Sequence, residues 1–275
     1  MRIKTNVVGI NSRAKLDNNI RDLERADRSL ASGDRIYQAA NDPAGLIISE
    51  SMRSRIRSFG QAQRNASDSI SLIQVAEGSL TEIQSMAARM KELALQSAND
   101  TLNDETRAYV DGEFQEMKTE IRRIIGGSQF NGRKILDRNA GLYEFQVGIN
   151  GNGKGERISY DMSKVLSSAE KVSLGSATVR TKHGALSTIS KVDDMLEEVS
   201  GARAFLGATQ TRVQATIQNL GISKENTAAA NSRIRDTDVA KATASKAISS
   251  IKTDASTGFL AHANTLPGKA ETLLE

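Results

Sequence analysis

Cysteine and tryptophan are absent from this 275-residue sequence, proline and histidine occur twice each, and the aromatic residues are four tyrosines and six phenylalanines. Without cysteine the chain has no disulfide, no thiolate metal ligand and no cysteine nucleophile. The two histidines, His183 and His262, are too few for a histidine-rich metal site. Because proline is the commonest helix breaker, its near-absence favours long uninterrupted helices.

The sequence also lacks a strong excess of charge and a long apolar run. Its 37 basic and 33 acidic residues are interspersed and leave a formal net charge of +4, which does not indicate a nucleic-acid binder. No stretch approaches the roughly 20 apolar residues that a membrane-spanning helix needs. The start, Met1–Ile10, lacks the apolar region and cleavage site of a secretory signal. We therefore expect any export to proceed without a cleaved leader.

An enzymatic function is not expected. His183 and His262 stand apart from any recognisable nucleophile, and the sequence contains no His-Glu-x-x-His run. Gly151, Gly153 and Gly155 superficially resemble a phosphate-binding loop, but no Lys-Ser/Thr pair or helix start follows them. Because strand-like patterns flank this run on both sides, we interpret it as a hairpin turn. We expect no cofactor and no metal.

Apolar residues recur at spacings of three and four over most of the chain, which indicates helices. One helix is expected from about Ile47 to Ser97, on the order of 70 Å long, and another from Asp104 to Ile125, ended by two glycines. A further helical stripe begins at Leu186 and continues to the end, with a late break at Leu266–Gly268. The longest stripe comprises Ala66, Ile70, Ile73, Ala76, Leu80, Ile83, Ala87, Met90 and Ala94.

The middle of the chain changes character. Asn131-Gly132 is a turn signal, and the alternation in Tyr143–Gly148 and Arg157–Asp161 predicts two strands. Two helical arms of similar length flank this region, and folding back beside each other is the economical way to bury their stripes. The predicted fold is mainly α, a long antiparallel helical bundle or coiled coil formed by the N- and C-terminal arms, with a small β-hairpin region in the middle.

The first and last 40 residues pose a burial problem. Each carries a narrow apolar seam with a coiled-coil period, interrupted near the start by Ser32–Arg35 and Asn41–Gly45. Two such helices paired together have little core and are marginal in isolation. We expect that they become ordered when copies of the same arms pack around them. The alternative is an ordinary coiled coil that is complete within one chain.

Several long motifs, in order along the chain, carry a resemblance to a known family. The start Met1–Asn6 is followed by Leu30–Ile36 and Asn41–Leu46, and then by Arg64–Leu80, Met90–Asn99 and Gln129–Gly132. Near the end, Ser232–Ala240 is a specific signature, and His262–Pro267 is similar to the usual closing segment. The sequence resembles bacterial flagellin, the subunit of the flagellar filament, at both ends and over most of its length.

The resemblance implies an inner coiled-coil domain of residues 1–43 and 236–275, and a helical rod domain of residues 44–235. Residues 137–185 then form a short variable region that contains the β-hairpin. The implied function is that of a structural subunit that polymerises into the filament for swimming motility. A hook–filament junction protein or a minor filament component is the alternative, because junction proteins share the terminal motifs. A signalling coiled-coil hairpin lacks the membrane segment or docking domain it would need.

The implied function depends on the geometry of the contacts between subunits, since a subunit that repeats one heterologous contact builds an open helical polymer. The apolar seams supply the predicted self-assembly residues. Replacing one buried Leu or Ile by Ala costs about 2–5 kcal/mol, so Leu23→Ala is expected to weaken polymerisation more than rod helicity. The predicted residues are Ile3, Val7, Ile10, Leu16, Ile20, Leu23, Ile248, Ile251, Phe259, Leu260 and Leu266.

The resemblance further implies several partners. Other copies of the chain form a helical homopolymer, a flagellar export chaperone covers the C-terminal arm, and filament cap and hook-junction proteins contact the ends of the polymer. Secretion through the flagellar channel implies an extracellular location. In some family members the vertebrate flagellin-sensing Toll-like receptor recognises a rod patch, and the matching positions here are Arg89, Leu93 and Glu113.

Overall fold

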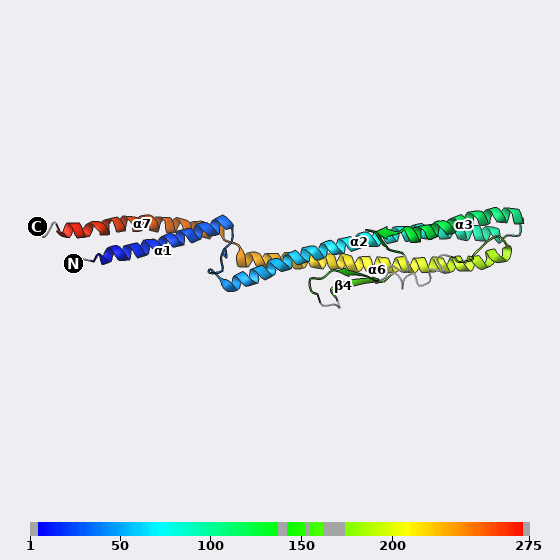
Figure 1. The fold of residues 1–275 in the computed structure, drawn as a ribbon, viewed down its shortest axis with the longest axis horizontal. Helices are drawn as coiled ribbons and strands as arrows, with labels where there is room; N and C mark the ends of the chain where they lie inside the picture. Colours follow the sequence, from blue (N-terminus) through cyan, green and yellow to red (C-terminus); the bar gives the residue numbers. More distant parts are fainter. Residues whose placement is uncertain (1–4, 137–141, 152–154, 162–173, 272–275) are drawn as a thin grey trace. The chain divides into compact units, whose positions relative to one another are not determined.

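The structure, a computed structural model, describes residues 5–136, 142–151, 155–161 and 174–271. The chain divides into two compact units. We call residues 1–56 with 225–275 the terminal unit, and residues 57–224 the central unit. The fold is mainly α, as predicted, with long helices toward both ends of the chain and short antiparallel strands in the middle (Figure 1).

The described helices each begin after a capping side chain that accepts a hydrogen bond from a backbone N–H two or three residues into the helix. The helix from Pro43 thus starts four residues earlier than predicted, with Pro43 at the first position, where its missing N–H costs nothing. The apolar stripe shows only where the helix becomes buried, whereas the capping residue determines where its first turn begins. The caps are Asn6, Asp42, Asn103, Thr181 and Asp238.

In the terminal unit, α1 (Val7–Ser32) and α7 (Val239–Glu271) lie side by side along their length (Figure 1). Helix α1 ends as predicted at the Ser32–Arg35 interruption, where Gly33 adopts a left-handed φ of 72° and its N–H bonds the Ser29 carbonyl. The predicted break at Leu266–Gly268 is wrong, because α7 continues through Pro267 to Glu271. A single proline removes one backbone donor, and the hydrogen bonds on either side continue the helix.

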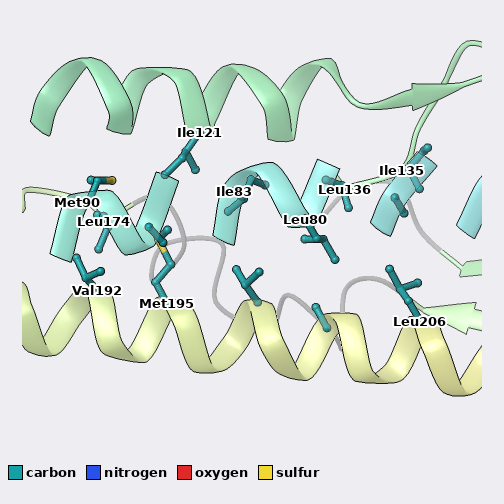
Figure 2. Packing of buried hydrophobic residues seen from close by; sticks show 14 of the residues in the cluster. Leu80, Ile83, Met90, Ile121, Ile135, Leu136, Leu174, Val192, Met195 and Leu206 are labelled. Carbon is teal, nitrogen blue, oxygen red and sulfur yellow. The ribbon is translucent and has the colours of Figure 1, made fainter. Parts of the chain in front are cut away.

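The central unit contains most of α2 (Pro43–Ser97), α3 (Asp104–Gly127) and most of α6 (Lys182–Arg235). A single buried apolar cluster joins all three, with α2 between the other two in Figure 2. Eight of the nine predicted stripe residues from Ala66 to Ala94 are fully buried members of this cluster, and Ile70 is partly buried against it, so the helical period located this core correctly.

Two small antiparallel hairpins follow α3. Strands β1 (Gln129–Phe130) and β2 (Arg133–Lys134) are joined by Asn131 and Gly132, whose φ values of 49° and 78° make the predicted Asn-Gly turn. Strands β3 (Leu142–Gln146) and β4 (Arg157–Asp161) confirm the second hairpin. Tyr160 of β4 is fully buried and stacks on Phe205 of α6. Of the glycine-rich turn between them, residues 152–154 lie outside the described residues.

Candidate self-assembly surfaces

Polar contacts connect α1 to α7 within the terminal unit. The Asn19 amide Nδ2 donates to the Ser256 hydroxyl at 2.8 Å and to the Lys252 carbonyl at 3.3 Å. At the far end of the pair, Asn6 Nδ2 donates to the Ala263 carbonyl at 2.8 Å. Lys246 and Asp27 form an ion pair at 2.8 Å between half-exposed side chains. The two helices therefore run antiparallel in a defined register.

The side chains that face each other across this pair are mostly small or polar. Each helix contributes one stripe of buried or half-buried residues at spacings of three and four, which we call the intrachain seam. Large apolar side chains in it are three leucines from α1 and one from α7. The seam comprises Gly9, Ser12, Leu16, Asn19, Leu23, Ala26 and Leu30 of α1 with Ser249, Thr253, Ser256, Leu260 and Ala263 of α7.

Larger apolar side chains of the same two helices lie outside the seam. Phe259 is 70% exposed, Ile251 68% and Ile10 60%. Isolated exposed apolar residues are ordinary, whereas a concentration of them on thin helices marks an interaction surface. We call this set the outer apolar residues of the arms: Val7, Val8, Ile10, Ile20, Val239, Ile248, Ile251 and Phe259.

The structure thus separates the predicted self-assembly residues into two groups. Leu16, Leu23 and Leu260 belong to the intrachain seam, and Leu266 is half-buried. Ile3 lies outside the described residues, and the remaining six are outer apolar residues: Val7, Ile10, Ile20, Ile248, Ile251 and Phe259. Val7, Ile10 and Ile20 thus lie outside the stripe of Leu16 and Leu23 that faces α7, and their part in self-assembly stays a prediction.

Arg235, at the end of α6, connects three segments of the terminal unit. Its guanidinium bonds the Asp34 carboxylate at 2.9 Å and the Glu50 carboxylate of α2 at 2.5 Å, with 15% of its side chain exposed. The Arg235 carbonyl accepts from Arg35 N–H, and the Gly33 carbonyl accepts from Thr237 N–H. The hydrogen bond from Arg235 lowers the pKa of Glu50 below its ordinary value. The motif Ser232–Ala240 did not predict this bridging role, because Asp34 and Glu50 lie 201 and 185 residues away from Arg235 in the sequence.

A second exposed apolar surface lies at the start of α2. Ile47 is 71% exposed and Ile48 is also exposed. Both line a shallow groove of the terminal unit together with Met52 of α2 and Ala230 of α6. Sequence reasoning assigned these residues only to a helix, because their exposure depends on how α6 packs against them.

The three positions matched to a receptor patch have different surroundings. Arg89 of α2 pairs with Glu92 at 2.9 Å and with Glu113 of α3 at 3.1 Å, and the side chains of Arg89 and Glu113 are about half exposed. These two carboxylates raise the pKa of Arg89. Leu93 is 1% exposed and belongs to the central core. Its placement in a surface patch is therefore wrong, because the α2 stripe turns it toward the core.

Among the described helices, none is long and apolar enough to cross a membrane. Across the described residues, no three His, Asp or Glu side chains come together in a group suited to a metal ion.

The fold and these surfaces define a class: a helical subunit with a well-packed central unit and lean, paired terminal helices. The family model for the bacterial flagellin N-terminal helical region matches residues 3–140, and the model for the C-terminal helical region matches residues 189–274. The chain belongs to the bacterial flagellin family.

Individual relatives agree with this assignment over the whole length. A flagellin of Halalkalibacterium halodurans is 42% identical and one of Bacillus subtilis is 33% identical, with both chains of each pair covered completely. A flagellar filament core protein of Brachyspira hyodysenteriae is 35% identical with the same complete coverage.

Two solved structures are also similar. The crystal structure of Bacillus cereus flagellin is 27% identical, with a TM-score of 0.51, over 57% of this chain and 88% of that one. A putative flagellar hook-associated protein of Vibrio parahaemolyticus has a TM-score of 0.59 over 71% of this chain and all of that one. Because the second structure is only 15% identical, it shows the shared fold alone.

The chain is accordingly a structural subunit of the bacterial flagellar filament, an extracellular polymer built from copies of its own family. The alternative of a hook–filament junction protein is not favoured, because the full-length relatives are flagellins and filament core proteins.

Proposed function

We propose that copies of this chain polymerise through the outer apolar residues of α1 and α7, which neighbouring subunits cover. The observation that carries the proposal is the exposure of Phe259, Ile251 and Ile10 on helices whose own seam is small and polar. Covering these side chains removes apolar surface from water, which supplies about 1.5–3 kcal/mol for each large side chain. In this assembly, residues 1–43 and 236–275 form the inner coiled-coil domain, and residues 44–235 form the rod.

The test compares assembly with folding. In a sedimentation assay of polymerised protein, Phe259→Ser is expected to raise the critical concentration about ten-fold or more, since a lost 1.4 kcal/mol is a factor of ten. Leu23→Ala is expected to raise it too while the rod keeps its helicity. Leu142→Ser, on an exposed residue of β3, is the matched control and should leave assembly unchanged. An unaltered critical concentration for Phe259→Ser would contradict the proposal.

We infer that an export chaperone covers the C-terminal arm before secretion without a cleaved leader. Ile248, Ile251 and Phe259 follow at spacings of three to eight residues along α7 and are exposed, as an amphipathic helix offered to a partner requires. In a binding assay with the flagellar export chaperone, Ile251→Ser/Phe259→Ser is expected to lose binding, and Val7→Ser on α1 is expected to keep it. The family resemblance alone supports the further proposal that filament cap and hook-junction proteins contact the ends of the polymer.

We also propose that the unassembled subunit engages the flagellin-sensing Toll-like receptor through Arg89 and Glu113, the two exposed members of the patch. Arg89→Ala/Glu113→Ala monomer is expected to lose signalling in a receptor reporter assay, while its helicity stays the same. Full signalling by this double variant would refute the proposal. Leu93 is unsuitable for the test, because its replacement disturbs the core.

A further inference from the structure

We infer that Asn19 fixes the register of α1 against α7, and that this register determines which apolar side chains the arms present to neighbouring copies. This inference rests on the proposed function, because it concerns the surface used for assembly. It assigns a positioning role to the polar residues of the intrachain seam.

Apolar packing alone does not define the register of this pair. The three large apolar residues that α1 contributes, Leu16, Leu23 and Leu30, are spaced seven residues apart. A partner helix that slides by one heptad therefore meets the same leucine pattern again. α7 opposes them with Ser249, Thr253 and Ser256, which are small and distinguish weakly between apolar registers. Another interaction has to select one register.

Asn19 supplies that interaction from the middle of the seam. It lies between Leu16 and Leu23, and its single amide group reaches both the Ser256 hydroxyl and the Lys252 carbonyl, one turn apart on α7. A slide of α7 by one heptad in one direction brings Ala263 opposite Asn19 in place of Ser256. That alanine offers no side-chain acceptor, so in that register the part-buried Asn19 amide loses its shorter hydrogen bond. A polar residue at one seam position is an established way to specify register.

At the end of the helix pair, Asn6 makes a similar side-chain contact from the N-cap of α1 to α7. This side chain caps Gly9 N–H through Oδ1 at 2.8 Å and donates through Nδ2 to the Ala263 carbonyl. Gly9 leaves room for it, since a Cβ at that position would lie 2.8 Å from Asn6 Nδ2. Together with the Lys246–Asp27 ion pair, Asn6 and Asn19 connect both ends and the middle of the pair. The three contacts are satisfied together only in the observed register.

A change of register would alter the assembly surface strongly. Sliding α7 by seven residues moves Ile251 and Phe259 by about 10 Å along α1, at 1.5 Å per residue. The outer apolar residues of α7 would then stand opposite different residues of α1. Polar contacts worth little to the stability of one pair therefore decide how that pair meets its neighbours.

The experiment maps the register by carbodiimide cross-linking, which joins a carboxylate to an amine only when they are in contact. In the wild-type chain the expected product is an amide between Asp27 and Lys246, identified by mass spectrometry. Polymers grown from equal amounts of ¹⁴N- and ¹⁵N-labelled chain distinguish links within a chain from links between chains. The same map is made on unassembled chain, so that the register is tested whether or not polymer forms.

Asn19→Leu is expected to reduce the Asp27–Lys246 link about ten-fold and to produce links from a shifted register, such as Lys252 to Asp27. Asn19→Ala, which introduces no larger side chain, is expected to do the same and covers the case in which the leucine variant fails to fold. Asn18→Leu, on the neighbouring exposed residue, is the matched control and should keep the wild-type map.

The outcomes separate the two hypotheses. An unchanged Asp27–Lys246 link in both Asn19 variants, or its absence from wild-type polymer, overturns the register inference. If Phe259→Ser assembles normally while the Asn19 variants shift the link, the proposed assembly surface fails and the register inference stands. A role of Asn19 in stability alone would lower helicity without creating links in a new register, and would also overturn the inference.

Discussion

At the scale of single residues, neighbouring positions on one helix have opposite roles. Arg89 and Leu93 are four residues apart on α2, yet Arg89 is half exposed in an ion pair and Leu93 is 1% exposed in the core. A half-exposed ion pair contributes about 0–1 kcal/mol, whereas truncation of a buried leucine leaves a cavity. The burial of each side chain therefore predicts the effect of its replacement.

Leu93→Ala is expected to lower the free energy of unfolding of the central unit by about 2–5 kcal/mol. Arg89→Ala should change it by less than about 1 kcal/mol. Urea denaturation followed by circular dichroism, at concentrations below assembly, measures both. Comparable losses for the two variants would contradict the burial of Leu93.

Arg235 and Glu50 give a prediction on pH. The hydrogen bond from Arg235 is the largest cause that lowers the pKa of Glu50, and Arg53 contributes less. A lowered carboxylate pKa means that the contribution to stability is complete above the ordinary pKa of 4.5 and is lost as pH falls through the lowered value. In an NMR titration, Arg235→Met is expected to return the pKa of Glu50 toward its ordinary value.

Arg53→Met is the control for this titration and should raise the pKa of Glu50 by a smaller amount, since Arg53 is the lesser cause. A Glu50 pKa that stays low in Arg235→Met would show that Arg235 does not bridge the segments as described.

At the scale of elements, two helical glycines differ in the space available for a larger side chain. Gly112 lies on the exposed face of α3 with no heavy atom within 4 Å of an added Cβ. Gly184, in the first turn of α6, has the Thr178 carbonyl oxygen 2.9 Å from where its Cβ would be. Both are helical, so propensity favours alanine at each, but only the first has room for it.

Gly112→Ala is expected to stabilise the central unit by about 0.5–1 kcal/mol, because alanine loses less backbone entropy in a helix. Gly184→Ala is expected to destabilise it, because the segment at Thr178 must move. Thermal unfolding of the two variants and of the wild type measures both changes in stability. Stabilisation by Gly184→Ala would contradict the close packing of Thr178 against Gly184.

At the scale of the whole molecule, the two units differ in how they are stabilised. The large buried cluster lies entirely within residues 57–224 and draws on three helices and the hairpins. The terminal unit pairs two helices through small and polar residues and leaves Phe259, Ile251 and Ile10 exposed. A unit with a core of its own folds by itself, whereas the paired arms gain further burial from neighbours.

A fragment of residues 57–224 is therefore expected to remain helical and to unfold cooperatively, and to show no polymerisation in the sedimentation assay. The full chain under the same conditions is the control for assembly. A fragment that forms filaments would place the assembly surface in the central unit instead of the arms.

Much of the fold was predictable from the sequence because its signals are local. The stripe from Ala66 to Ala94 predicted the core face of α2, and Asn131-Gly132 predicted its turn. Helix starts were displaced by four residues at Pro43 and at Lys182, because apolar periodicity does not report the caps. The self-assembly residues were predicted as one set, because the spacing shows that the apolar phase of α1 shifts but does not show which phase faces α7.

The sequence by itself determined that the chain is helical, that α1 ends at the Ser32–Arg35 interruption and α3 at its two glycines, and that it resembles flagellin, because period, turns and motifs are properties of consecutive residues. Only the tertiary structure decided that the stripe with Asn19 faces α7, that Leu93 is buried and that Arg235 joins Asp34 to Glu50. Those outcomes depend on which distant segments meet, and a helical stripe specifies an apolar face without specifying its partner.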